Sequence, residues 1–380
     1  MKNLKRIILI AGIVISTLCA AWSPYRRVLA KPLSAEEDSM TEALKAFGAI
    51  GPIDDHTHIF KPDPAFQAFI ERVHLTVLDI LVVDGTSPYH RHLEPQRGDA
   101  LAAVHASRGH LAFCTTFDAY KFNRPDFATE AIRQLDQDFA EGAIAVKVWK
   151  NIGMELKNTQ GAFVMPDDPK FGPIYRDIAK HGKTLMMHTA EPDSCWAPLD
   201  PAHPQATDEY YRQHPYWYMG DKPDRPSKAK ILSARDRVIA ENPKLRVVGA
   251  HLGSMEMDMN DVARHLDRYP NFAVDIGGRT EYLMTAPHEQ VRAFLIKYQD
   301  RIMYGTDLTL ANEFGPHTTQ NVQEVIKEWE KTYAQDWTFF ATDRTVDYGG
   351  KKIPGLKLPQ SVLRKVFREN AIRWFPGIVP

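Results

Sequence analysis

The chain has 380 residues, of which 44% are hydrophobic and 25% charged, a composition sufficient for one large buried core. Lysine and arginine (47 residues) balance aspartate and glutamate (48 residues), so the formal net charge is −1. Because no basic excess is present to neutralise phosphates, nucleic acid is excluded as an expected partner.

The N-terminus has the pattern of an export signal. Three of the first six residues are basic, and an apolar run follows from Ile7 to about Ala21. This run is short for a membrane span and suits the hydrophobic region of a signal peptide, which would be cleaved after Ala21 or after Ala30. We expect residues 1–30 to be a signal peptide or, if uncleaved, a membrane anchor. Either reading predicts an exported protein, periplasmic or secreted.

Short apolar runs alternate with amphipathic segments along the rest of the chain, after a helix near Ala35–Phe47. Eight of the runs are strand candidates: Ala49–His58, Val77–Val83, Leu111–Phe117, Ala143–Lys150, Thr184–Ala190, Arg246–Leu252, Asn271–Ile276 and Arg301–Thr306. Eight strand-then-helix units predict an α/β fold, a (β/α)8 TIM barrel that spans residues 31–380 as one domain. The alternative that the pattern allows is an open, doubly wound sheet.

Two connections are too long for simple turns. They are Thr189–Ser227, which is rich in proline and aromatic residues, and Leu308–Lys357, which is partly helical around Asn321–Ala334. They follow the fifth and eighth predicted strands, so both lie at the carboxyl face of the predicted barrel. Long loops at this face are often lids over an active site. The alternative is a surface excursion packed by its own aromatic side chains.

The first predicted strand carries two histidines. His56 and His58 are two positions apart, and side chains alternate across a strand, so both lie on the same face. Two imidazoles at adjacent positions of one face can hold one divalent ion. The pair alone is weak evidence, because histidines at this spacing also occur on surfaces and in cores.

Three further polar residues each follow an apolar strand. His188, His251 and Asp307 come at the ends of the fifth, sixth and eighth predicted strands. In a barrel these ends form the catalytic rim. Because buried polar groups are costly without partners, their convergence with the histidine pair favours a site over packing.

With this ordered set, the sequence from residue 49 onward resembles the amidohydrolase superfamily. It is most similar to the amidohydrolase-related branch, which contains metal-dependent decarboxylases and lactone hydrolases. The resemblance implies that His56, His58 and Asp307 bind a first metal, joined by His188 in a one-metal site. It implies that His251 binds a second metal or, with one metal, acts as an acid–base and electrostatic group. It also implies a homo-oligomer, as in many members.

Lys147 bears on the number of metals. Alternation along the fourth strand places Val146 and Val148 toward the helices and Lys147 toward the barrel interior. In two-metal members of the superfamily, a lysine of this strand is carbamylated and bridges both ions. One alternative is an unmodified Lys147 that binds an anionic substrate or pairs with Asp54. Another is that Lys150, rather than Lys147, is the bridging lysine.

The implied ligands and their neighbours suggest a chemistry. Three imidazoles and a carboxylate suit Zn²⁺, as one ion or two, with Mn²⁺ or Fe²⁺ as alternatives. Asp307 is the expected general base toward a metal-activated water, and His251 is expected to stabilise the oxyanion. Substrate contacts are expected from residues that follow strands four, five and seven, with a solvated surface role as the alternative for each: Lys150, Glu191, Arg279 and Glu281.

These residues predict a hydrolase that attacks the carbonyl of a small ester, lactone or amide. The alternative is a non-oxidative decarboxylase of a small unsaturated or aromatic carboxylic acid, which the same ligands would serve. Export favours hydrolysis, because decarboxylases of metabolic intermediates usually work inside the cell. A barrel that only binds a ligand would have lost a metal ligand, and a nuclease would carry basic loops, so neither fits this sequence.

Overall fold

The computed structural model describes residues 35–85, 91–199, 208–222, 224–310 and 319–379. The predicted signal or anchor segment at 1–30 lies outside these residues, so export stays a prediction. Among the described helices, none combines the length and the hydrophobicity that crossing a bilayer requires.

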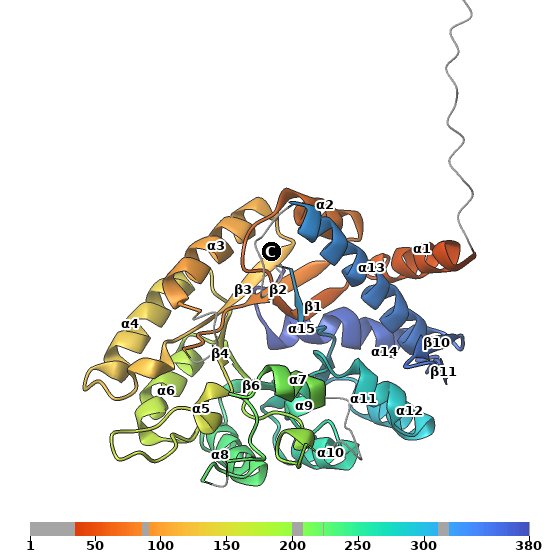
Figure 1. Cartoon of the computed structure of the whole chain (residues 1–380). Coiled ribbons are helices and arrows are strands. Elements are labelled where there is room, and N and C mark those ends of the chain that lie inside the picture. The colour runs from red at the N-terminus through yellow and green to blue at the C-terminus, as the bar shows by residue number, and fades with distance from the viewer. Residues whose placement is uncertain (1–34, 86–90, 200–207, 223, 311–318, 380) are drawn as a thin grey trace, which may run out of the picture.

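Nine strands form one parallel, curled sheet of the TIM-barrel type (Figure 1). Strands β1 to β8 follow one another around the sheet in chain order, and β9 lies on the other side of β1. Each of the eight predicted runs overlaps one of the strands β1 to β8. The strands are β1 (Ile53–His58), β2 (Thr76–Ile80), β3 (Leu111–Thr116), β4 (Ala145–Val148), β5 (Thr184–Met187), β6 (Arg246–Gly249), β7 (Phe272–Asp275), β8 (Ile302–Met303) and β9 (Leu308–Thr309).

The segment from β8 to β9 contacts both edges of the sheet. Its first part, β8, pairs with β7, and its last part, β9, pairs with β1. Between them, the Tyr304 carbonyl accepts a hydrogen bond from the Asp55 amide (3.0 Å), and the Asp307 amide donates to the His56 carbonyl (2.7 Å). These bonds to β1 curl the sheet and bring the eighth strand's end beside the first strand.

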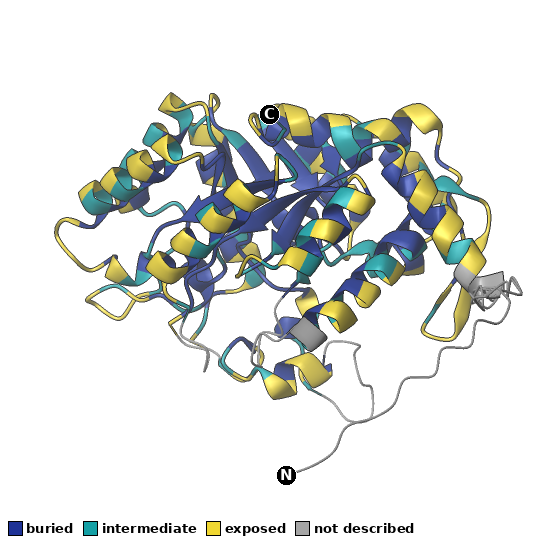
Figure 2. Ribbon diagram, turned by 90° about the horizontal axis from the view of Figure 1, so that it is seen from above, coloured by how far each residue is buried: buried dark blue, intermediate teal, exposed yellow. Residues whose placement is uncertain are grey.

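Helices alternate with the strands and surround the sheet. In Figure 2 the strands are buried, and the helices carry their exposed faces outward. The helix predicted near Ala35–Phe47 is confirmed as α1. The helices are α1 (Ala35–Gly48), α2 (Pro64–Arg72), α3 (Leu93–Ala106), α4 (Phe127–Ala140), α5 (Asn151–Met154), α6 (Gly172–Lys180), α7 (Asp208–Gln213), α8 (Lys228–Glu241), α9 (Ala250–Gly253), α10 (Met259–Arg268), α11 (Thr280–Thr285), α12 (His288–Lys297), α13 (Thr319–Ala341), α14 (Gln360–Arg364) and α15 (Asn370–Trp374).

The two faces of the sheet pack into different apolar clusters, as the two-residue period of strands requires. One face packs against the surrounding helices, with Val146 and Val148 among its residues. The other face, which includes Ala145 and Met186, fills the inside of the sheet together with Trp374 and other residues near the C-terminus. The inner face is therefore apolar at one end, and its polar residues gather at the carboxyl ends of the strands.

A β-bulge in β1 decides which residues of this strand face inward. Asp54 and Thr57 pair with Val77 and Asp79, so three steps along β1 match two along β2. One extra residue turns the side chains that follow to the opposite face. Asp54 consequently lies toward α13, whereas His56 lies inside the sheet.

The connection after β8 forms a helix and a hairpin. Helix α13 packs against α1 and α2 on the outside of the sheet, so that segments near the two ends of the chain lie side by side (Figure 1). Strands β10 (Thr345–Tyr348) and β11 (Lys351–Pro354) pair antiparallel beyond it. The described part of this connection is thus largely a packed outer layer of the fold.

Candidate metal centre

His56, His58 and Asp307 converge at the carboxyl end of the sheet. The Oδ1 atom of Asp307 lies 3.4 Å from Nε2 of His56 and 3.3 Å from Nε2 of His58. The ligand atoms of the three residues all lie within 4.8 Å of one another, as the donors of one metal ion must. The two histidines predicted to share a face of β1 therefore meet the predicted strand-eight aspartate.

Hydrogen bonds on the far side of each ring set the tautomers of these histidines. His58 Nδ1 lies 2.7 Å from the Ile80 carbonyl oxygen, and His56 Nδ1 lies 3.1 Å from Asp275 Oδ2. A carbonyl or carboxylate oxygen only accepts, so Nδ1 carries the proton in both rings. The Nε2 atoms then keep their lone pairs toward Asp307, as metal ligands require.

Asp307 has a backbone that few residues adopt, with φ of 62°. Its amide donates to the His56 carbonyl, and this bond holds the carboxylate against the two imidazoles. Burial opposes ionisation of Asp307, but the imidazoles of His56, His251 and His58 outweigh it and hold the pKa well below its usual range. The carboxylate is consequently ionised at neutral pH.

His188 and His251 lie next to this cluster. His251 Nδ1 donates to the Gly277 carbonyl (2.7 Å), so its Nε2 accepts from Nδ1 of His188 (3.2 Å). The remaining nitrogen of His188, Nε2, is buried and has no hydrogen-bond partner among the described residues. Burial lowers the pKa of both imidazoles well below the usual value, so both are neutral near pH 7.

The sequence analysis did not single out Asp275, yet this residue organises the cluster. It is the last residue of β7 and is fully buried. Oδ2 faces His56 Nδ1, and Oδ1 accepts from the amides of His251 (2.9 Å) and Gly277 (2.8 Å). Burial raises its pKa, but the charge and the hydrogen bond of His56, with the charges of His251 and Lys147, lower it to about 2. The sequence did contain a signal for Asp275: like His188 and His251, it is a polar residue at the end of an apolar strand.

Lys147 faces the interior of the sheet, as alternation along β4 predicts. Its side chain is 1% exposed, and Nζ lies 3.2 Å from His56 Nε2 and 3.7 Å from Met186 Sδ. The structure does not contain the alternative Lys147–Asp54 pair. Asp54 instead accepts hydrogen bonds from the hydroxyls of Thr306 (2.6 Å) and Tyr333 (2.8 Å). Burial lowers the pKa of Lys147. Its carbamylation stays a prediction.

The donors present fit a divalent cation. Neutral imidazoles and an ionised carboxylate are the ligand types of such sites, and their outer nitrogens are held by hydrogen bonds. Nε2 of His188 is buried without a hydrogen bond, with Glu191 Oε1 3.8 Å away, and is a further donor that a cation would satisfy. His56 also belongs to a second group with ligand atoms within 4.8 Å, formed with His251 and Asp275.

A family model described as "Amidohydrolase" matches residues 53–377, which is most of the chain. The chain belongs to the amidohydrolase family. Membership makes it an enzyme, and it confirms the resemblance on which the ligand assignments were based. A search among curated proteins finds no match.

Solved structures with similar folds include enzymes of two kinds. A probable 2-pyrone-4,6-dicarboxylic acid hydrolase from Acinetobacter baumannii is 12% identical, covering 86% of this chain and 99% of its own, with a TM-score of 0.47. A manganese-bound dihydroxybenzoic acid decarboxylase from Polaromonas is 11% identical (86% and 96%; TM-score 0.49). A zinc-bound amidohydrolase from Burkholderia multivorans is 11% identical (87% and 99%; TM-score 0.44). Because these TM-scores are low, the structural similarities do not contribute to the family assignment, which rests on the family model.

A cavity of about 230 Å³ opens over the ligand cluster of this amidohydrolase. His56, His58, His188 and Asp307 line it, together with Lys147. Its wall is largely aromatic, and the long connection after β5 contributes to it. The wall residues include Phe60, Trp149, Tyr210, His214, Tyr216 and Trp217.

Two of the four predicted substrate contacts form a buried pair at this cavity. Lys150 lines the cavity and contacts Glu191 directly, with side chains 6% and 7% exposed. Its ammonium also lies 4.5 Å from the centre of the Trp217 ring. Burial opposes its charge, but Glu191 raises the pKa of Lys150 above its usual range.

The other two predicted contacts, Arg279 and Glu281, do not line the cavity. Arg279 Nε lies 3.7 Å from Glu256 Oε2, and Glu281 accepts a hydrogen bond from the Tyr348 hydroxyl of the hairpin. Both follow β7 as predicted, but the chain turns into α11 at once, and this turn directs Glu281 toward the hairpin. The structure therefore directs Glu281 away from the site, whereas Arg279 lies outside the cavity lining but close enough to His188 and His251 for its charge to lower the pKa of both.

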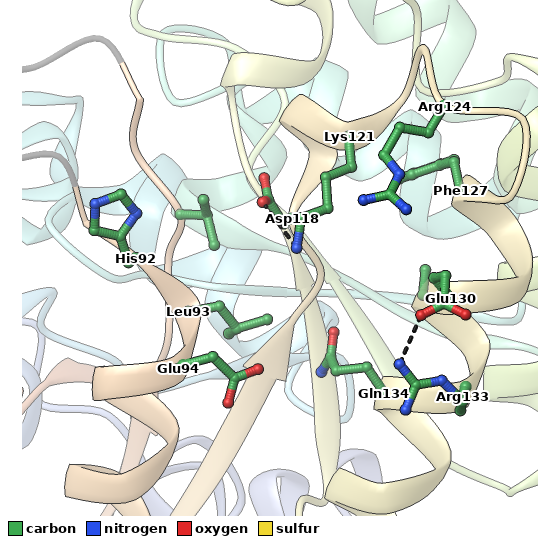
Figure 3. Close-up of a pocket in the computed structure, with 12 residues that line it drawn as sticks. His92, Leu93, Glu94, Asp118, Lys121, Arg124, Phe127, Glu130, Arg133 and Gln134 are labelled. Carbon is green, nitrogen blue, oxygen red and sulfur yellow. Dashed lines mark hydrogen bonds and ion pairs between the residues drawn. The ribbon is translucent and has the colours of Figure 1, made fainter.

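A second, larger cavity of about 390 Å³ lies between α3 and α4 (Figure 3). Four of its charged side chains are paired with one another: Lys121 lies 3.4 Å from Asp118, and Arg133 lies 2.6 Å from Glu130. It holds none of the metal-ligand groups described above. The candidate metal site therefore lies at the smaller cavity.

Proposed function

We propose that this amidohydrolase is a metal-dependent hydrolase that uses water to attack the carbonyl carbon of a small ester, lactone or amide. The convergence of His56, His58 and Asp307 at the floor of a cavity carries the proposal. The volume of about 230 Å³ lies below the range of about 300–1,000 Å³ for drug-sized ligands, so the substrate is small.

His56, His58 and Asp307 would hold one divalent cation, with His188 Nε2 as the fourth donor. Zn²⁺ suits three imidazoles and one carboxylate. A divalent cation at such a site lowers the pKa of water and polarises a carbonyl oxygen.

Asp307 is the residue that moves the proton. Its Oδ1 faces the imidazoles, and its Oδ2 lies toward Gly278, where a Cβ would be 3.3 Å from this oxygen. Gly278 has φ of 57° and no side chain, so Oδ2 stays uncovered. The ionised carboxylate can accept a proton from the attacking water and deliver it to the leaving group.

His251 acts as a positioning residue in this scheme. Its Nε2 accepts from His188 Nδ1, which keeps the lone pair of His188 on Nε2. The direct acid–base and oxyanion role that the resemblance implied for His251 would require this hydrogen bond to break. The aromatic wall and Lys150 would bind the substrate, with Trp217 beside the Lys150 ammonium.

Three wider features belong to the same proposal. We propose that the curled sheet closes into a (β/α)8 barrel. We also propose that the connection Thr189–Ser227 is a loop that covers the cavity. Residues 1–30 direct export or anchor the chain to a membrane. The enzyme works on small molecules and assembles with copies of itself.

A substrate panel tests the proposed reaction. The purified full chain, loaded with Zn²⁺, is incubated with small aryl esters, lactones and amides and, separately, with hydroxybenzoic acids. We expect hydrolysis of at least one carbonyl class, no release of CO₂, and loss of the hydrolysis in His58→Ala. Release of CO₂ without any hydrolysis would overturn the proposal in favour of the decarboxylase.

A further inference from the structure

The chain leaves β6 through a left-handed turn. Four consecutive residues, His251, Leu252, Gly253 and Ser254, have φ of 60°, 55°, 66° and 59°. Only glycine adopts this region freely, and other residues enter it singly rather than in a row. All four residues are buried, and three of them carry side chains. Such a strained backbone persists only where its surroundings hold it.

Hydrogen bonds to two neighbouring segments hold the ends of this turn. At its start, the His251 amide donates to Oδ1 of Asp275, the last residue of β7 (2.9 Å). At its end, the Ser254 hydroxyl donates to the carbonyl of Ala190, which follows β5 (2.7 Å). Neither of these bonds involves Gly253, which lies between the two ends.

Arg235 of α8 holds the Gly253 carbonyl. Its side chain is fully buried, and Nη1 donates to this carbonyl oxygen. Nε and Nη2 both donate to Asp236 Oδ1, at 3.0 and 2.7 Å, and Cζ lies 5.4 Å from the centre of the Phe272 ring. A buried arginine is costly even when it is paired, and the proposed reaction does not use its charge. What connects Arg235 with the site is its bond to the turn.

The turn carries His251 into the ligand cluster. Nδ1 of His251 donates to the Gly277 carbonyl (2.7 Å), and its Nε2 accepts from Nδ1 of His188 (3.2 Å). The second of these bonds keeps the lone pair of His188 on Nε2, the proposed donor to the metal. A displaced turn would take the acceptor away from His188, and partners of this kind control how well a histidine binds metal.

We propose that Arg235 is a positioning residue for the metal centre. By holding Gly253, it keeps the left-handed turn in place and so keeps His251 against His188. Arg235 acts at a distance, because the described lining of the cavity does not include it. The inference rests on the metal site of the proposed function.

Zinc affinity in a double-mutant cycle tests this role. Zn²⁺ alone is titrated into metal-free full chain, in competition with a chromophoric chelator, for wild type, Arg235→Met, His251→Ala and the double variant. Arg235→Met should weaken Zn²⁺ binding about tenfold, a typical loss when the partner of a metal-binding histidine is disturbed. In the His251→Ala background the same change should have no further effect, because the residue through which Arg235 acts is gone.

The matched control is Arg97→Met. Arg97 is another buried arginine, which donates to Asp138 and lies outside the cavity lining. Its loss should destabilise the fold, because Asp138 is left unpaired, but should not change Zn²⁺ affinity. Thermal unfolding in chelator checks that each variant is folded. If Arg235→Met does not fold, Arg235→Lys replaces it, since lysine keeps the charge beside Asp236 without the planar fork of donors.

Two results would overturn the inference while leaving the metal site intact. Wild-type Zn²⁺ affinity in the folded Arg235 variant would reduce Arg235 to a packing role. An equal loss with and without His251 would show that Arg235 acts by another route. Failure of wild type to bind Zn²⁺ would instead contradict the proposed function.

The strain in the turn can be measured without metal. Ser254→Ala and Ser254→Gly both lose the bond to Ala190, but only glycine is free to adopt φ of 59°. In chelator, the glycine variant should unfold at a temperature about 1–2 °C above that of the alanine variant. An alanine variant at least as stable as the glycine variant would contradict a left-handed turn that needs to be held.

Discussion

In the proposed mechanism, Asp307 provides one oxygen to the metal and uses the other as the general base, and the two functions can be separated. In Asp307→Asn the amide oxygen remains near His56 and His58, but the side chain no longer accepts a proton. We expect kcat/KM for hydrolysis to fall by about 100-fold or more, a typical loss for a general base. The zinc content should fall less. Parallel measurement of both quantities checks this, and an equal loss of both would assign Asp307 to metal binding alone.

The buried Lys150–Glu191 pair gives a second prediction for single residues. Lys150→Met leaves Glu191 buried without its partner, a change that typically costs about 3 kcal/mol. The double variant Lys150→Met/Glu191→Gln has no charge left there, so much of this stability should return. Denaturant unfolding in the presence of chelator, which removes any contribution from metal, measures both. A single variant as stable as wild type would show that solvent reaches the pair.

At the scale of elements, the bulge in β1 could not be predicted from the sequence. The spacing of His56 and His58 correctly places both on one face, but the face depends on the register with β2, which is a contact between distant segments. Asp275 was missed although it ends an apolar strand like His188. The eight strands were predictable, because a short apolar run marks each of them.

Helix α13 contributes a pH dependence of stability through Asp336, which accepts a hydrogen bond from the Tyr304 hydroxyl (2.8 Å). Burial raises the pKa of Asp336 from 3.8 to about 7, although the bond from Tyr304 opposes the shift. The folded state therefore holds this proton more tightly than the unfolded state does. Its contribution to stability is fully present below pH 3.8 and is lost as the pH rises to about 7.

Asp336→Asn should remove this dependence. Between about pH 4 and 7, the wild type should lose up to about 1.4 kcal/mol per pH unit more than the variant does. Urea unfolding at several pH values, in chelator, measures the difference. Identical slopes for the two proteins would mean that Asp336 is ionised in the folded state throughout this range.

For the whole molecule, the sequence was sufficient to predict the family and a TIM-barrel type of α/β fold, and it predicted the residues that the structure brings together as a candidate metal site. It was not sufficient for the surroundings of the site. Glu281 was placed at the cavity from its position after β7, but the contact with Tyr348 holds it elsewhere. Arg279 was placed there for the same reason, and its contact with Glu256 keeps it out of the cavity lining while it stays beside His251. Such contacts join distant parts of the chain, and no local pattern reports them.

The measurement that tests the central claim most directly is the metal content per chain, determined by elemental analysis. Freshly purified wild type is compared with His56→Ala, His58→Ala and the control Asp336→Asn. We predict one divalent ion per chain in wild type and control, and little or none in the two histidine variants. Full metal content in either histidine variant would contradict the proposed site, and a wild type that neither contains nor takes up a divalent ion would contradict the metal-dependent mechanism.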